Sequence, residues 1–206
     1  YHFTRIFKER IGLTPQYYVS SIRLQKAKAL LLSTNLKIRD IGLEIGQQSL
    51  GTFTTRFTER VGVTPSQFRA SMQQAQEDFY SLKQWDHWPS FILSEHSSNT
   101  IEGKIQAETN FEGIILIGLF PKAIPEGMPL YGTLLPSLGE FRLTGVKPGA
   151  YYIMATSVSW EMNPVDLMLP NQTLRYRSTT ITVHPDTTVP FQQITLRAAR
   201  LDDPPI

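Results

Sequence analysis

The sequence predicts a multidomain fold: an all-α half with two helix-turn-helix units over residues 1–79, a junction over 80–99, and an all-β antiparallel sandwich over 100–206. Three observations predict this division. A helical pattern in the first half recurs fifty positions later. From Thr100 onward the apolar period changes from helical to alternating, with Pro-Gly turns. Residues 1–69 carry eleven Lys and Arg against four Asp and Glu, a net charge of +7, whereas the rest of the chain is acidic.

The composition excludes several protein classes. A chain of 206 residues with 41% hydrophobic content can bury one ordinary core or two small ones. No apolar run in the chain approaches the roughly 18 residues of a membrane span. We expect no signal peptide, a cytoplasmic protein and no membrane partner. The absence of cysteine excludes a disulfide scaffold, a thiolate zinc site and a cysteine nucleophile. A strongly basic half has the electrostatics of a polyanion binder.

A repeated pattern defines the helical half. Its two copies read Phe3-Thr4-x-x-Phe7-x-Glu9-Arg10-x-Gly12-x-Thr14-Pro15 and Phe53-Thr54-x-x-Phe57-x-Glu59-Arg60-x-Gly62-x-Thr64-Pro65. In each copy the two phenylalanines lie four apart, which predicts a helix on which they share a buried stripe. The glycine can take the left-handed conformation that ends a helix, and the Thr-Pro pair supplies the N-cap and first residue of the next helix.

Apolar residues at helical spacing predict the other helices of this half. The pattern predicts helices over 15–33, 37–44 and 50–60, and a further helix from Pro65 onward. Ser49 is the expected N-cap of the third, and Gly46 the turn before it. A short helix, a glycine-containing turn and a second helix form the arrangement that places its second helix in the major groove of DNA.

Three motifs with fixed spacing follow one another in this half: Arg23-x3-Ala27-x2-Leu30-Leu31, Ile38-x-Asp40-Ile41-x4-Gly46, and Phe53-x3-Phe57-x4-Gly62-Val63-Thr64-Pro65-x2-Phe68-Arg69. Over residues 1–70 the chain thereby resembles the DNA-binding domain of AraC/XylS-type bacterial transcription regulators. The resemblance implies two helix-turn-helix units joined by the helix over 15–33, an asymmetric site on double-stranded DNA, and gene activation through contact with RNA polymerase. The DNA-binding residues it implies are Tyr1, Thr4, Arg5, Gln48, Leu50, Gly51, Thr52, Thr54, Thr55 and Arg56.

The chain departs from this family at several positions. Family members often carry arginine at the position of Thr55 and alanine at that of Gly42, and many have an aromatic residue at that of Gln47. Here Arg56 stands one place after Thr55, about 100° around the helix, so we expect it to contact phosphate rather than bases. A helical protein-interaction scaffold with no specific operator is the alternative function for this half.

The start of the chain is a further departure. The first residues already belong to the first recognition helix, so we expect this chain to be a fragment, or the ordered part, of a longer protein. Without the two helices that precede it in the family, Phe3 and Phe7 would lack the surface against which they pack.

The second half predicts a sandwich of about six short strands. The expected strands cover 101–108, 113–120, 139–143, 151–158, 174–183 and 191–197. The stretch Gly139-x-Phe141-x-Leu143-x2-Val146-x-Pro148-Gly149-x-Tyr151-x-Ile153-x-Ala155 resembles carboxypeptidase-regulatory or transthyretin-like sandwiches. An immunoglobulin-like sandwich remains the alternative.

Apolar side chains on both faces of the strands predict that something covers the outer face of one sheet. The strand over 113–120 is apolar throughout, and if Tyr151 and Ile153 point inward, then Tyr152 and Met154 point outward. The cover could be the tryptophan-rich junction, a second subunit in a homodimer, or a small apolar or aromatic effector. The candidate ligand or interface residues are Trp85, Trp88, Phe120, Tyr152, Met154 and Trp160.

The sequence carries no catalytic constellation. Its four histidines are scattered, no serine lies in a nucleophile elbow, and no glycine-rich loop joins a strand to a helix. We therefore expect neither an enzyme nor a cofactor or metal site. The sequence predicts a DNA-binding transcription regulator whose sandwich senses a small molecule or mediates assembly.

Overall fold

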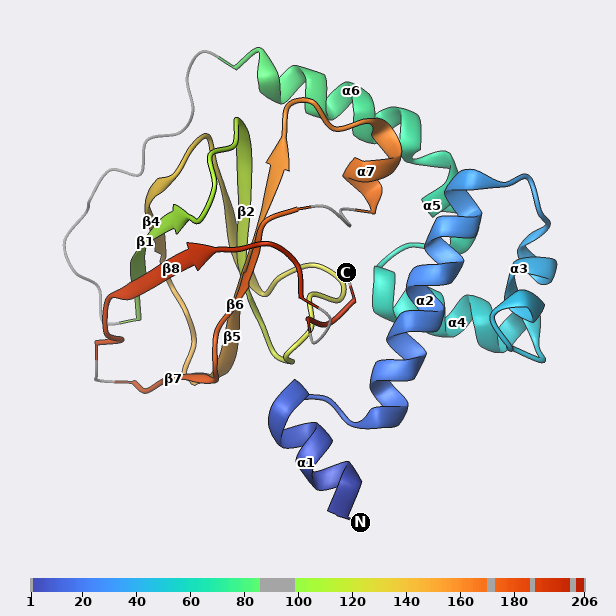
Figure 1. Ribbon diagram of the computed structural model, residues 1–206, viewed down its shortest axis with the longest axis horizontal. Helices are drawn as coiled ribbons and strands as arrows, with labels where there is room; N and C mark the ends of the chain where they lie inside the picture. Colours follow the sequence, from blue (N-terminus) through green and yellow to red (C-terminus); the bar gives the residue numbers. More distant parts are fainter. Residues whose placement is uncertain (1, 86–98, 170–172, 186–187, 201–202, 206) are drawn as a thin grey trace.

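The computed structural model describes residues 2–85, 99–169, 173–185, 188–200 and 203–205, with the helical half on one side and the sandwich on the other (Figure 1). The helical half contains α1 (His2–Ile11), α2 (Pro15–Ser33), α3 (Ile38–Glu44), α4 (Leu50–Val61), α5 (Pro65–Ala70) and α6 (Met72–Lys83). These bounds confirm the helices predicted over 15–33, 37–44 and 50–60 to within a residue. The helix predicted from Pro65 onward is divided at Ser71 into α5 and α6. In the described part of the chain, no helix has the length and apolar character needed to cross a membrane.

The helix ends follow the predicted capping residues. Gly12 and Gly62 adopt the left-handed conformation, with φ of +83° and +92°, after α1 and α4. The Thr14 hydroxyl accepts a hydrogen bond from the Tyr17 N–H at 3.3 Å, and Thr64 forms a capping box with Gln67. The two copies of the repeat therefore end their helices by the same local chemistry.

The second helix-turn-helix unit packs around the phenylalanines of α4. Phe53 and Phe57 are almost fully buried, and the Phe57 ring meets Phe68 edge-on with 5.6 Å between centroids. Leu31 of α2 and Ile41 of α3 belong to the same core cluster. The buried side of α4 thus fixes which side of the helix faces outward.

The sandwich consists of two sheets with an apolar core between them. Its strands are β1 (Ile101–Ala107), β2 (Gly113–Phe120), β3 (Tyr131–Leu135), β4 (Gly139–Leu143), β5 (Gly149–Ser159), β6 (Arg175–Arg177), β7 (Ile181–Val183) and β8 (Gln192–Leu196). One sheet has the order β4-β1-β8 and the other β3-β2-β5-β6, with β7 also paired to β5. Tyr151, Ile153 and Ala155 lie in the core between the sheets, which confirms their predicted inward orientation.

The strand pairing differs from expectation in two respects. β1 and β8 pair in parallel, whereas the other pairs of named strands are antiparallel. The single strand expected over 174–183 is divided into β6 and β7. The division has a local cause, because the Ser178 hydroxyl accepts the Ile153 N–H at 2.8 Å in place of a ladder carbonyl.

Two short elements were not predicted. β3 lies between prolines and has only five residues, so its alternation is brief. A seventh helix, α7 (Pro164–Met168), begins at the N-cap Asn163, whose side-chain oxygen accepts the Asp166 N–H at 2.9 Å. The Asn-Pro pair is a recognisable helix start.

Helix α6 docks on the outer face of the larger sheet near one end (Figure 1). It continues across positions 79 and 80, the predicted boundary between the helical half and the junction. The Phe79 ring lies 5.1 Å from that of Trp160, and Ile114 and Val158 complete this apolar cluster. Of the three possible covers, helix α6 therefore supplies the one at this end of the sheet, through Phe79 and Leu82.

Candidate nucleic-acid interface

Helix α4 presents a polar outer face opposite its buried phenylalanines. The Ser49 hydroxyl caps the helix by accepting the Thr52 N–H at 3.4 Å. Among the residues expected to bind DNA, Thr54 is half-buried, and the exposed ones are Gln48, Leu50, Gly51, Thr52, Thr55 and Arg56. The structure thus brings the candidates of the second unit together on and just before one helix.

Helix α1 presents a second polar face. Thr4 and Arg5 are exposed, and Tyr1 lies outside the described residues. The prediction that both phenylalanines of this copy share a buried stripe is wrong for Phe3, whose side chain is 67% exposed. Phe7 is half-buried because its ring packs edge-on against Tyr18, with 5.6 Å between centroids.

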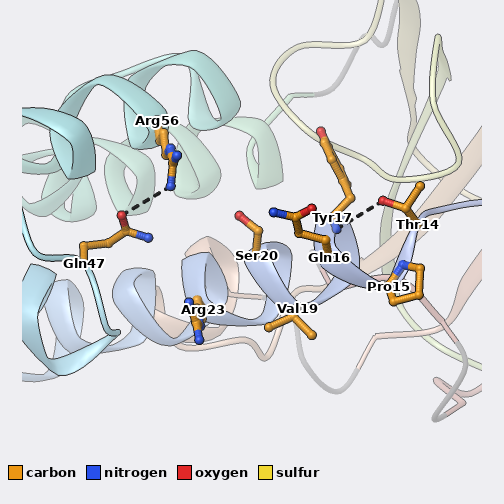
Figure 2. A pocket seen from close by; sticks show the side chains of 9 residues that line it. All are labelled: Thr14, Pro15, Gln16, Tyr17, Val19, Ser20, Arg23, Gln47 and Arg56. Carbon is orange, nitrogen blue, oxygen red and sulfur yellow. Dashed lines mark hydrogen bonds between the residues drawn. The ribbon is translucent and has the colours of Figure 1, made fainter. Parts of the chain in front are cut away.

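A groove of about 580 Å³ lies between the first half of α2 and the side chains of Gln47 and Arg56 (Figure 2). Its polar lining includes Gln16, Ser20 and Arg23 from α2 and, across from them, Gln47 and Arg56. The Arg56 Nη1 donates a hydrogen bond to the Gln47 side-chain oxygen at 3.4 Å. Guanidinium, amide and hydroxyl groups are typical contacts for a phosphate backbone.

A loop of the sandwich over residues 121–130, called the β2–β3 loop here, contacts the helical half. The Glu126 carboxylate accepts hydrogen bonds from the Tyr17 hydroxyl and the Arg60 Nη2, and from the Ser21 hydroxyl at 3.3 Å. The Arg60 Nη1 also donates to the Ser20 hydroxyl at 2.8 Å. The charged side chains of Arg60 and Glu126 are only 13% and 14% exposed, so this ion pair is largely removed from water.

The same loop packs against the end of α1. Ile124 is buried with Ile11 and Leu13 in one apolar cluster. From the sheet, the Arg177 Nη1 donates to the Ile11 carbonyl at 2.5 Å and to the Ala123 carbonyl at 3.4 Å. The sandwich therefore touches the C-terminal ends of both candidate recognition helices and leaves their polar outer faces exposed.

Lys28 of α2 lies close to this ion pair. Burial lowers the pKa of Lys28 from 10.5 to about 8; the charge of Glu126 opposes this shift, and that of Arg60 adds to it. Between pH 8 and 10.5 the folded chain therefore binds fewer protons at this amine than the unfolded chain does. The lowered pKa therefore reduces the free energy of unfolding. The reduction is complete below pH 8 and becomes smaller as the pH rises toward 10.5.

Replacing Lys28 by methionine should therefore stabilise the protein at neutral pH. We expect a gain of about 2 kcal/mol at pH 7, because a pKa unit corresponds to about 1.4 kcal/mol and the side chain is only partly buried. The gain should largely vanish near pH 10. Urea unfolding at both pH values measures this, with the exposed Lys104→Met as the control. An equal gain at both pH values would contradict the lowered pKa.

Three of the candidate ligand or interface residues lie on the outer side of the larger sheet. Phe120 and Met154 line a cavity on the outer face of the larger sheet, and Trp160 lies under α6. Tyr152 is half-buried and is absent from the lining of that cavity, and Trp85 is 51% exposed after α6. Trp88 lies outside the described residues.

Sequence reasoning missed the residues that join the two halves. Glu126 stands in a proline- and glycine-rich loop with no motif around it. Arg60 was visible only as part of the repeat, and its counterpart in the first copy, Arg10, is exposed. Equivalent positions of a repeat can have different neighbours, so only the three-dimensional arrangement identifies this contact. Within the described ranges, no three His, Asp or Glu side chains gather at a metal-binding spacing.

Comparison with known proteins bears on the helical half. Residues 1–71 match a family described as a helix-turn-helix domain. Similar proteins include the bifunctional transcriptional activator/DNA repair enzyme AdaA of Bacillus subtilis, 35% identical over 83 residues, which are 40% of this chain and 39% of that protein. The melibiose operon regulatory protein of Escherichia coli is 35% identical over 74 residues, or 36% of this chain and 24% of that protein.

A third relative is the transcriptional regulator MtrA of Neisseria gonorrhoeae, which is 38% identical over 65 residues, or 32% of this chain and 22% of that protein. The chain thus spans well under half the length of these relatives. No solved structure matches the chain at a significant level. Residues 1–71 form a helix-turn-helix domain similar to parts of proteins named as a transcriptional activator and a transcriptional regulator.

Proposed function

We propose that the protein is a sequence-specific transcription regulator that binds double-stranded DNA through α1 and α4. The observation that carries this proposal is the exposed polar face of each helix, outside the contact with the sandwich. Helix α2 joins the two units; its 19 residues correspond to a length of about 28 Å. This length is comparable to the distance between successive major grooves on one side of DNA, which is about 34 Å.

The groove along α2 supports the same function. A DNA backbone that passes between two occupied major grooves would run along the surface between the two recognition helices. The groove offers Arg23 and Arg56 there, and both side chains are exposed. These contacts would strengthen binding to any DNA sequence, whereas α1 and α4 would read the bases.

The sandwich in this proposal senses a small molecule or mediates assembly, including a homodimer. Activation through RNA polymerase is the outcome that the resemblance of the helical half favours, and a cytoplasmic location follows from a role on DNA. A protein-interaction scaffold with no operator remains the alternative function. Its distinguishing property would be salt-sensitive binding to DNA without preference for sequence.

The test is selection of binding sites from random duplex DNA by the full chain, followed by affinity measurements with three variants. Arg5→Ala and Thr52→Ala should each weaken binding to the selected site about tenfold and leave binding to random DNA unchanged, because base contacts contribute about 1–3 kcal/mol each. Arg56→Ala should weaken binding to both DNAs and reduce the salt dependence, because a phosphate contact releases counterions.

The matched control is Arg200→Ala, which removes an exposed positive charge from the sandwich. It should change the affinity for the selected site and for random DNA only by the small effect of the altered net charge. Enrichment of one asymmetric site with two contact blocks a helical turn apart would support the regulator. Binding without any enriched sequence would refute it and favour the scaffold.

A further inference from the structure

We propose that the cavity on the outer face of the larger sheet binds a small organic acid, a molecule with an apolar body and one anionic group. This proposal names a ligand class for the sensing role proposed above. Binding itself does not depend on that role; only the consequence of binding for the helical half rests on it. The cavity has a volume of about 680 Å³. Sites for small organic ligands commonly have volumes of about 300–1,000 Å³ and mainly apolar linings.

The floor of the cavity is an apolar sheet surface that the fold leaves partly open. Leu116 lies in the central part of β2 and is 40% exposed, although its strand neighbours Ile115 and Ile117 are buried. Met154 of β5 lines the same floor. Helix α6 and Trp160 cover the sheet nearer to Ile114, so the opening lies next to a covered region rather than on a wholly bare sheet.

The β2–β3 loop forms one wall because two glycines allow it to approach the sheet. Gly118 and Gly132 are paired opposite each other in β2 and β3. A Cβ atom at Gly118 would lie 2.5 Å from the Pro129 Cβ, and one at Gly132 would lie 2.9 Å from the Pro129 Cγ. Pro129 therefore rests on these glycines, and the neighbouring Met128 and Leu130 form an exposed apolar rim.

The charged groups of the lining favour an anion. Arg175 and Arg177 both line the cavity, and they lie on the same face of β6 because they are two residues apart. The lining carboxylate among the described residues is that of Asp203, which accepts two hydrogen bonds from Arg197, at 2.7 and 2.9 Å, and one from the Arg200 N–H at 2.7 Å.

Asp203 is therefore a structural carboxylate. Burial acts against its ionisation, but the hydrogen bonds from Arg197 and the Arg200 N–H outweigh this effect, so its pKa lies below the ordinary value. A cationic ligand would have to compete with Arg197 for it. An anionic ligand would instead meet the guanidinium groups of Arg175 and Arg177, which bind carboxylates well. Arg175 donates to the Thr173 hydroxyl at 3.4 Å and Arg177 to the Ile11 and Ala123 carbonyls, so the ligand would share these groups, each of which has five N–H donors.

Three walls of the cavity also contact the helical half. Pro125 and Gly127 line the cavity, and Glu126 between them bonds to Arg60 at the end of α4. Met168 of α7 lines the cavity and packs against the core of the second helix-turn-helix unit. Arg177 holds the Ile11 carbonyl of α1. A ligand that displaces these walls would change the support of both recognition helices.

Anilinonaphthalene sulfonate is a suitable probe, because it joins a fluorescent aromatic body to one anionic group; N-phenylnaphthylamine has the same body without the charge. The first test titrates the full chain with both. Met128 is 85% exposed on the rim, so its substitution should not disturb the fold. Met128→Asp should lower the affinity for the sulfonate probe about threefold to tenfold, and Met128→Lys should raise it. The reason is that partly screened charge pairs contribute up to about 1 kcal/mol. Both variants remove the same apolar rim contact, so they should change binding of the neutral probe to the same extent.

A second pair of variants locates the probe. Leu116→Trp fills the floor of the cavity and should weaken both probes at least about tenfold. Leu138→Trp, at a similarly exposed leucine outside the lining, should weaken neither. Unchanged sulfonate binding in Leu116→Trp, or equal responses to both Met128 variants, would overturn the proposal. These titrations contain no DNA, so their outcome is independent of whether an operator is found.

Discussion

Replacing Glu126 by glutamine should lower the free energy of unfolding of the full chain by about 3 kcal/mol at pH 7. The substitution keeps the shape of the side chain but leaves Arg60 as an uncompensated cation that is only 13% exposed. Breaking a buried ion pair from one side typically costs about 3–5 kcal/mol, because the remaining charge is neither solvated nor paired. Urea unfolding followed by circular dichroism measures the change.

The matched control for this experiment is Glu44→Gln. It breaks the ion pair between Lys26 and Glu44, in which the Lys26 Nζ lies 2.8 Å from the Glu44 Oε1. The side chains of Lys26 and Glu44 are 53% and 55% exposed. Exposed pairs contribute little, so this variant should unfold almost as the parent does. Equal unfolding curves for the two variants would show that Glu126 does not stabilise the contact between the halves.

Substitution of Gly12 by alanine should destabilise the protein by about 3 kcal/mol, whereas the same change at Gly62 should cost about 1 kcal/mol. Both glycines follow a helix end and have positive φ, a backbone conformation that is unfavourable for alanine, so both variants are strained there. Only at Gly12 would the new Cβ lie 2.5 Å from another atom, the Cβ of Ala123 in the β2–β3 loop; at Gly62 nothing lies within 4 Å. The difference between the two equivalent positions measures the contact with the sandwich.

A double variant separates the backbone effect from the collision. Removing the Ala123 methyl group in Gly12→Ala/Ala123→Gly should recover about 1–2 kcal/mol relative to Gly12→Ala, since the crowded atom is gone. Thermal and urea unfolding of the four combinations give the coupling energy. Additive effects would mean that the loop is not pressed against the end of α1.

The sequence alone predicted the features that depend on neighbours along the chain. The helix ends at Gly12 and Gly62 and the N-caps at Thr14 and Ser49 follow from local hydrogen bonding, and the structure confirms them. The bounds of β2 were also predicted, because a continuous apolar run between turn residues is a strong signal.

The features that the sequence did not predict depend on residues far apart in the chain. Nothing near Glu126 indicates that its partner is Arg60, and Phe3 has the same local pattern as the buried Phe53 although it is exposed. The exposed face of α4 could be deduced from the phenylalanine stripe. The support behind it could not, since a loop of the sandwich supplies that support from the other half of the chain.

The parallel pairing of β1 with β8 has a consequence for the order in which the protein matures during synthesis. β1 is the central strand of its sheet, and Ile105 pairs with Ile194, which the ribosome adds much later. The other sheet is built around β2, β3 and β5, which lie near one another along the chain, so their pairing closes shorter loops and can form earlier. The β2–β3 loop belongs to that earlier sheet. The helical half can thus form its contact with Glu126 before β8 has been synthesised and has paired with β1.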